Sequence, residues 1–139
     1  MFVLDTNILS AMMRLDRTPE VAAWMAGQDE YRLYTTAISH AEIFAGLAIM
    51  TNSRRRHTLE TTAREMFDEF AGRILPFDTD AASAYADLFA IRRKAGRPAM
   101  PMDLMIAAIA RANGASMVTR DLGGFEDCGL TLINPWEAA

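Results

Sequence analysis

The sequence predicts a three-layer α/β/α sandwich with a mostly parallel central sheet, and three observations lead to this prediction. Short apolar runs alternate along the chain with longer stretches of helical periodicity. This alternation is typical of β-α-β units, whose helices cover both faces of a parallel sheet, and their crossovers are right-handed. The length of 139 residues is about that of one domain. We therefore expect a single domain over residues 1–139.

The first half of the chain supplies three expected strands and four expected helices. The strands are Phe2–Leu4, Arg32–Thr36 and the ILPF segment 74–77. Apolar residues at helical spacing predict helices over 6–14, 19–27, 39–50 and 53–71. Thr18 is the expected cap of the second helix, and Pro19 favours its first turn.

The second half repeats the alternation. A helix is expected from Thr79 to Ala95, with Gly96 ending it. Another helix begins at Pro101 and ends at Gly114. Two more apolar runs follow and are expected to be strands, SMVT at 116–119 and LTLIN at 130–134.

Composition excludes several classes of protein. Hydrophobic residues make up 51% of the chain and charged residues 23%, which indicates a globular protein and not a disordered one. The single cysteine excludes an internal disulfide framework, and no apolar run approaches the ~20 residues needed to span a bilayer. We expect a cytoplasmic protein with no membrane partner. The net charge of −4 argues against a general polyanion binder, but it leaves open an enzyme that handles phosphates through metal ions.

Four carboxylates follow strands or open helices. Asp5 ends the first strand, Glu42 lies in the first turn of the helix expected at 39–50, Asp103 lies in the first turn of the Pro101 helix, and Asp121 follows the SMVT strand. In an open parallel sheet, strand carboxyl ends and helix amino ends share one edge. The four side chains can therefore converge there. A cluster of carboxylates repels itself without a cation, and oxygen ligands suit Mg²⁺ or Mn²⁺. Such a site can activate water for attack on a phosphodiester.

Each acid also has a purely structural interpretation. The segment Ser39–Glu42 fits a capping box, in which the glutamate bonds back to the cap amide. Asp103 complements a helix dipole. Asp5 and Asp121 are compatible with ordinary turn or cap positions. Only the shared sheet edge favours a metal site over four separate caps. Neither His40 nor His57 has a catalytic partner pattern, and we expect both to face solvent.

Four segments carry a family resemblance that spans nearly the whole chain. LDTNILSAMMR, AISHAEIFAGL, DLMIAAIARANGASMVTRD and the ending INPW resemble a PIN-domain ribonuclease, and more closely the VapC-type toxins of toxin–antitoxin pairs, particularly the FitB-like branch. The resemblance implies a PIN-like fold, a Mg²⁺- or Mn²⁺-dependent endoribonuclease, and a homodimer. It also implies an antitoxin that inhibits the enzyme.

The resemblance also assigns site residues. The acids of the family, which hold the metal, correspond to Asp5, Glu42, Asp103 and Asp121, and its strand-end threonine corresponds to Thr119. The chain departs from many relatives at two positions: Arg120 stands where an asparagine is common, and Gly124 stands where an acid precedes the phenylalanine. Asp121 is therefore chosen as the fourth ligand by elimination.

These features predict the toxin of a type II toxin–antitoxin module. The all-carboxylate site predicts hydrolysis of RNA phosphodiesters to 5′-phosphate and 3′-hydroxyl ends. The expected partners are the RNA substrate, a second copy of the chain and a cognate antitoxin with a DNA-binding domain. The alternative function is that of the dimerising, non-catalytic half of a DNA-binding repressor complex.

Two surface features are left open by this prediction. The run Arg54-Arg55-Arg56 is either a solvated helix start or a contact with RNA phosphates. The first two helices carry more apolar side chains than can face one sheet, namely Met12, Met13, Val21, Trp24 and Met25. They predict either a groove for a partner or a methionine-rich core.

Overall fold

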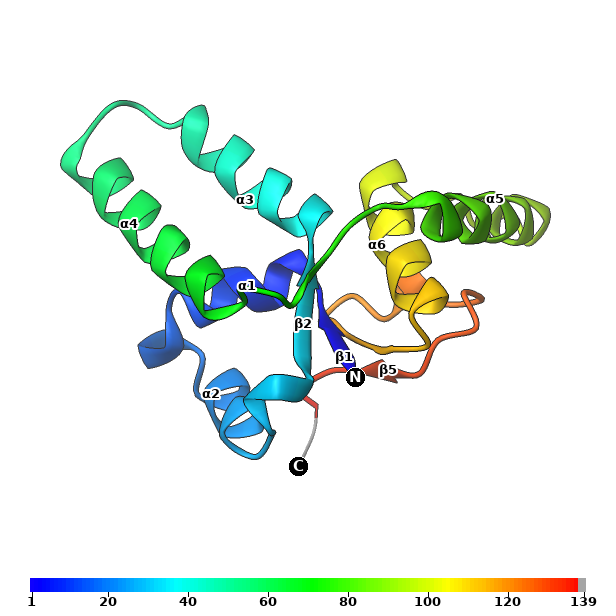
Figure 1. Ribbon diagram of the computed structural model, residues 1–139, viewed down its shortest axis with the longest axis horizontal. Helices are drawn as coiled ribbons and strands as arrows, with labels where there is room; N and C mark the ends of the chain where they lie inside the picture. The colour runs from blue at the N-terminus through cyan, green and yellow to red at the C-terminus, as the bar shows by residue number, and fades with distance from the viewer. Residues whose placement is uncertain (138–139) are drawn as a thin grey trace.

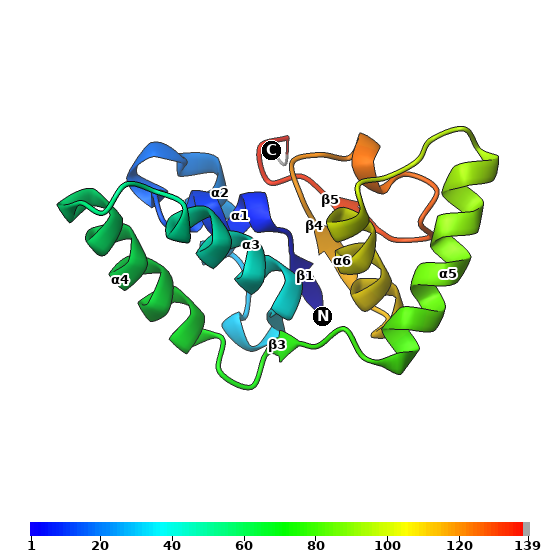
Figure 2. The same cartoon turned by 90° about the horizontal axis from the view of Figure 1, so that it is seen from above.

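A five-stranded sheet lies between two groups of helices in the computed structural model, which describes residues 1–137 (Figures 1 and 2). The strands are β1 Phe2–Leu4, β2 Leu33–Thr36, β3 Ile74–Leu75, β4 Ser116–Val118 and β5 Leu132–Ile133. The α-helices are α1 Thr6–Met12, α2 Pro19–Ala26, α3 Ala37–Ala48, α4 Arg54–Glu69, α5 Thr79–Lys94 and α6 Pro101–Ala112. Single 3₁₀ turns occur at Leu15–Arg17, Glu30–Arg32 and Gly123–Phe125.

The strand order is β3-β2-β1-β4-β5, and every pairing is parallel. This confirms the predicted three-layer α/β class. Because β1 pairs with β2 on one side and β4 on the other, the chain winds outward in both directions from the centre. Leu4 pairs with Val118, so the residues that follow them, Asp5 and Thr119, leave the sheet side by side. This is the switch point at which open α/β sheets bind ligands.

The two faces of the sheet bury separate clusters of side chains. Val3 packs into a cluster formed largely by α6, β4 and Leu88 of α5. Its neighbour Leu4 packs into a cluster formed by α1, α4 and Val21 of α2. Both residues are fully buried. Successive side chains of a strand point to opposite faces, and a three-residue strand therefore anchors both helix layers.

Two predicted helix starts are wrong in detail. The helix predicted at 39–50 begins two residues earlier, because Thr36 ends β2 in extended conformation and its hydroxyl accepts a 3.0 Å hydrogen bond from the Ser39 amide. Thr36 is therefore the cap, Glu42 lies in the second turn, and the capping-box interpretation is wrong. Thr18 precedes α2 but does not cap it. Its hydroxyl lies 3.0 Å from the carbonyl oxygens of both Ala11 and Arg14.

Other predicted helix boundaries differ from the observed ones by one or two residues. Gly96, the expected end of α5, has a φ of +71°, a conformation that suits glycine after a helix. Among residues 1–137, none of the helices is both long and apolar enough to span a bilayer.

Candidate active site

Asp5 is the centre of the site and is only 4% exposed. One carboxylate oxygen, Oδ1, accepts the Thr6 amide at 2.8 Å, so Asp5 also caps α1. The other oxygen, Oδ2, accepts the Thr119 hydroxyl at 2.8 Å and the side-chain amide of Asn7 at 3.3 Å. These three donors hold the carboxylate in one orientation at the carboxyl end of β1.

Thr119 connects Asp5 to the loop after β4. The threonine is fully buried, and its hydroxyl oxygen accepts the Asp121 amide at 3.1 Å while it donates to Asp5. The exposed carboxylate of Asp121 accepts the Gly124 amide at 3.0 Å. The loop therefore folds back on Asp121 and holds it beside the sheet edge.

Glu42 is positioned by a chain of hydroxyl groups. The Thr6 hydroxyl donates to Glu42 Oε1 at 2.9 Å and lies 3.0 Å from the Ser39 hydroxyl. The Ser39 hydroxyl in turn lies 3.4 Å from that of Thr36. Ser39 and Thr36 are both fully buried. The end of β2, α3 and the first residue of α1 thus cooperate to orient one carboxylate.

Electrostatic coupling shows which of the predicted acids lie near one another. The pKa of Asp5 is raised from 3.8 to about 6: burial is the largest cause, the negative charges of Asp103 and Glu42 add to it, and the hydrogen bonds from Thr119 and Thr6 oppose it. Burial and the charge of Asp121 likewise raise the pKa of Asp103. Asp103 lies in the first turn of α6. Asp5 is therefore within electrostatic range of Glu42 and Asp103, and Asp103 is within range of Asp121.

The donor set fits a hard divalent cation in its chemistry. All four groups offer oxygen ligands, and none of the ion pairs formed within residues 1–137 involves any of them. Buried carboxylates without a cationic partner are unfavourable, and Asp5 is in this condition. Over the same residues, no group of three or more histidine, cysteine or acidic side chains is placed so that it could hold a metal ion as it stands. The chemistry of the donors thus fits a divalent cation, whereas their side chains are not arranged around one.

Thr6 and Ser39 are the positioning residues that the sequence analysis missed. One feature of the sequence could have indicated Thr6: it carries a hydroxyl group directly after Asp5, at the start of α1. Asn7 contacts both Asp5 and the backbone of Arg120, whose amide donates to Asn7 Oδ1 at 3.3 Å.

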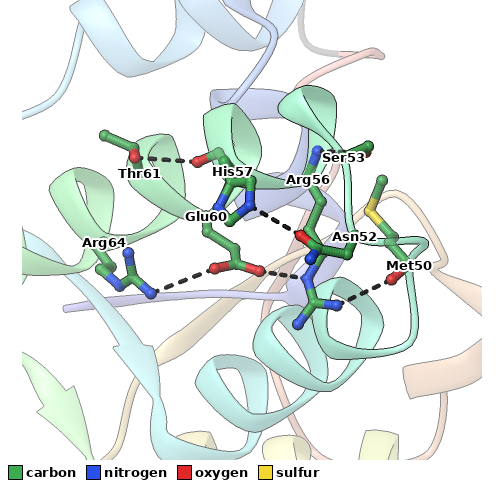
Figure 3. A network of polar contacts seen from close by, with 8 residues as sticks. All are labelled: Met50, Asn52, Ser53, Arg56, His57, Glu60, Thr61 and Arg64. Carbon is green, nitrogen blue, oxygen red and sulfur yellow. Dashed lines mark hydrogen bonds and ion pairs between the residues drawn. The ribbon is translucent and has the colours of Figure 1, made fainter.

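Both histidines are exposed, as predicted. The ring of His40 packs against Phe44 and Phe67, with ring centres 4.6 and 4.7 Å away. His57 lies 2.9 Å from the Asn52 side chain at the start of α4 (Figure 3). Neither ring contributes to the acidic site.

A doubly wound parallel sheet with an acidic switch-point edge defines a class of α/β proteins that bind ligands at the strand carboxyl ends. Within this class, the model of the PIN domain matches residues 2–128. The chain belongs to the PIN-domain family.

Several relatives match over their whole length. The plasmid stability protein StbB of Pseudomonas syringae pv. tomato is 42% identical, covering 99% of this chain and 100% of the relative. The VapC ribonuclease Y4jK of Sinorhizobium fredii is also 42% identical, with 100% of both chains covered. Toxin FitB of Neisseria gonorrhoeae is 34% identical over 98% of this chain and 99% of its own. The structure of FitAB bound to an IR36 DNA fragment has a TM-score of 0.92 and 33% identity, covering 100% of this chain and 98% of that chain.

Proposed function

We propose that this protein is the ribonuclease toxin of a type II toxin–antitoxin module and that it hydrolyses RNA phosphodiesters to 5′-phosphate and 3′-hydroxyl ends. Two kinds of observation support this proposal. Full-length relatives at 42% and 34% identity are a VapC ribonuclease and a toxin. The single structural observation that carries it is the buried Asp5 carboxylate, which forms no ion pair with a basic side chain within residues 1–137 and lies within electrostatic range of other acids.

Asp5, Glu42, Asp103 and Asp121 are the residues that would hold a divalent ion, either Mg²⁺ or Mn²⁺. When bound, such an ion supplies an activated water and neutralises charge on the leaving oxygen. The chain itself contributes orientation. Thr119 and the Thr6 amide fix the Asp5 carboxylate, and the Thr6 hydroxyl fixes Glu42. No histidine takes part, which favours attack by water over attack by the ribose 2′-hydroxyl.

We further propose that the protein forms a homodimer and binds a cognate antitoxin that carries a DNA-binding domain. The similarity of this chain to the solved structure of FitAB bound to a DNA fragment supports the antitoxin and DNA-binding part of this proposal. Side chains of Met12 and Met25 line a cavity of about 350 Å³ beside α2, and this cavity is a candidate contact for the antitoxin. Trp24 is not part of it. Its ring packs edge-on against Phe2, 5.5 Å between centres, and is partly buried against the core cluster that contains Leu4 and Ile8.

Cleavage by the purified protein tests the proposal. A 5′-labelled RNA is incubated with the protein in Mg²⁺ or Mn²⁺, in EDTA, and with the Asp5→Asn variant. We expect cleavage only by the unmodified protein with metal, with 5′-phosphate and 3′-hydroxyl products. Cyclic 2′,3′-phosphates or full activity in EDTA would contradict the mechanism.

The second candidate function is that of a non-catalytic, dimerising half of a DNA-binding repressor. The DNA-bound FitAB structure favours it. Complete absence of RNA cleavage under the conditions above, together with cooperative operator binding by the antitoxin complex, would establish this alternative instead.

A further inference from the structure

A cavity of about 420 Å³ opens directly beside the acidic site, between α1, α3 and α4. Thr6 and Glu42, which belong to the acidic site, form part of its wall. Figure 1 shows α3 and α4 running side by side above α1. Residues of all three helices line the cavity, which is open to solvent. A ligand bound in this cavity would therefore lie next to Glu42 of the acidic site.

The wall of the cavity has an apolar part and a basic part. Met13, Ile43 and Leu47 supply the apolar surface. Arg14 and Arg55 supply two positive charges, and both residues are exposed. A site that combines a small apolar surface with two guanidinium groups matches a ligand with a flat ring and negatively charged phosphates.

Arg14 and Arg55 differ from Arg56 and Arg64 of α4 in their ion pairs. Arg56 donates a 2.6 Å bond to Glu60, which also pairs with Arg64 at 3.4 Å (Figure 3). Within the part of the chain that the structure describes, neither Arg14 nor Arg55 forms an ion pair. Their charges are thus available to a ligand, whereas those of Arg56 and Arg64 are partly neutralised.

We propose that this cavity is a substrate subsite that holds one nucleotide of the RNA next to the bond that is cut. The base lies against Met13, Ile43 and Leu47, and the flanking phosphates meet Arg14 and Arg55. The volume is in the range of about 300–1,000 Å³ typical of small-ligand pockets. Because the chain carries a net charge of −4, local cations are needed to hold RNA beside four carboxylates. The inference rests on the proposed ribonuclease activity.

Removing the two charges tests the basic half of the subsite. The double variant Arg14→Gln/Arg55→Gln is compared with Arg54→Gln/Arg64→Gln, which removes two exposed charges of α4 outside the cavity. Initial rates are measured on a mixed-sequence, fluorophore-labelled 12-nucleotide RNA with Mg²⁺. We expect KM to rise about tenfold in the first variant with kcat within about twofold, and the control to keep the KM of the unmodified protein. The slope of log kcat/KM against log salt should become shallower by about 1.4, the value for two phosphate contacts on a single strand.

Filling the cavity tests the apolar half without changing any charge. Gly46 lines the cavity, and a Cβ built on it meets no atom within 4 Å. Gly46→Leu therefore places a side chain in open space, and replacing glycine inside a helix favours the fold. Ala45→Leu, at an exposed position of α3 outside the cavity, is the control. We expect Gly46→Leu to raise KM several-fold at an unchanged or higher Tm, and Ala45→Leu to leave KM unchanged.

Three results would overturn the inference, and they are distinguishable. If the unmodified protein cleaves RNA but Arg14→Gln/Arg55→Gln and Gly46→Leu keep its KM and salt slope, the subsite is absent while the proposed function stands. If the same variants keep KM but lose affinity for the purified antitoxin, the cavity is a protein-docking site instead. If the unmodified protein cleaves no RNA, the proposed function fails and the subsite fails with it.

Discussion

The hydroxyl of Thr119 donates a 2.8 Å hydrogen bond to Asp5 Oδ2, although the two residues are 114 positions apart in the sequence. They meet because β1 and β4 are paired in the sheet, with Leu4 opposite Val118. The same hydroxyl oxygen accepts the Asp121 amide. One buried side chain thus connects the acid of the first strand to the loop that carries the fourth acid.

Replacing Thr119 by valine should raise the pKa of Asp5 beyond about 6, because the Thr119 hydrogen bond opposes the effect of burial on this carboxyl group. The acid limb of the pH profile for cleavage should move to higher pH. Thr119→Ser keeps the hydroxyl and should restore the original limb. The profile is measured as kcat/KM between pH 5 and 9. Equal profiles for the valine and serine variants would show that the hydroxyl does not position Asp5.

The four acids should differ in their importance for cleavage. Asp5→Asn, Glu42→Gln and Asp103→Asn should each lower kcat/KM at least about 100-fold with the fold retained, since each removes a charge from the proposed ion site. Asp121→Asn should cost only about tenfold, because its amide oxygen still orients water. Glu65→Gln, an exposed acid of α4, is the control. Wild-type turnover by Asp103→Asn at low Mg²⁺ would contradict the ligand assignment.

Asp5 should destabilise the metal-free protein as the pH rises. Its pKa is raised from 3.8 to about 6, so the folded state binds the proton more tightly than the unfolded chain, and stability falls between about pH 4 and 6. At pH 7.5 in EDTA, Asp5→Asn should gain up to about 3 kcal/mol in free energy of unfolding, at about 1.36 kcal/mol per pKa unit. Urea unfolding at pH 4 and 7.5 measures this difference. A gain of the same size at both pH values would exclude the proposed cause.

Divalent ions should stabilise the folded protein through the carboxylates. Any ligand that binds only the folded state raises its stability by mass action. Addition of Mg²⁺ or Mn²⁺ at 100 times its Kd should therefore contribute about 2.7 kcal/mol, seen as a higher Tm in differential scanning fluorimetry. Asp5→Asn and Asp103→Asn should lose this shift. An equal rise in Tm for these variants would place the ion elsewhere.

A side chain at Gly124 should displace the carboxylate of Asp121. A Cβ built on Gly124 comes 2.6 Å from Asp121 Oδ2, whereas one on the adjacent Gly123 comes no closer than 3.8 Å to Asp121 Oδ1. Gly124→Ala should displace the carboxylate and lower kcat/KM about as much as Asp121→Asn. Gly123→Ala should retain activity. Identical values of kcat/KM for the two alanine variants would show that Asp121 does not contribute to the site.

The alternation of apolar strands and periodic helices was enough to predict the α/β class, because each element must bury one face. The same pattern predicted which acids follow strands or open helices, and therefore which side chains can share the sheet edge. It misplaced the start of α3. Ser39 and Glu42 have the spacing of a capping box, but Thr36 was already at the end of an extended strand and caps the helix instead.

The positions of the four acids along the chain, and the order of the strands and helices that carry them, follow from the sequence because both depend on local spacing. The tertiary structure alone decided how those acids are held. The bonds from Thr119 to Asp5 and from Thr6 to Glu42 join residues on different elements, and no local pattern encodes such distant pairs. The cavity between α1, α3 and α4 has the same origin. Its shape depends on how three helices pack, and packing depends on contacts between residues far apart in the chain.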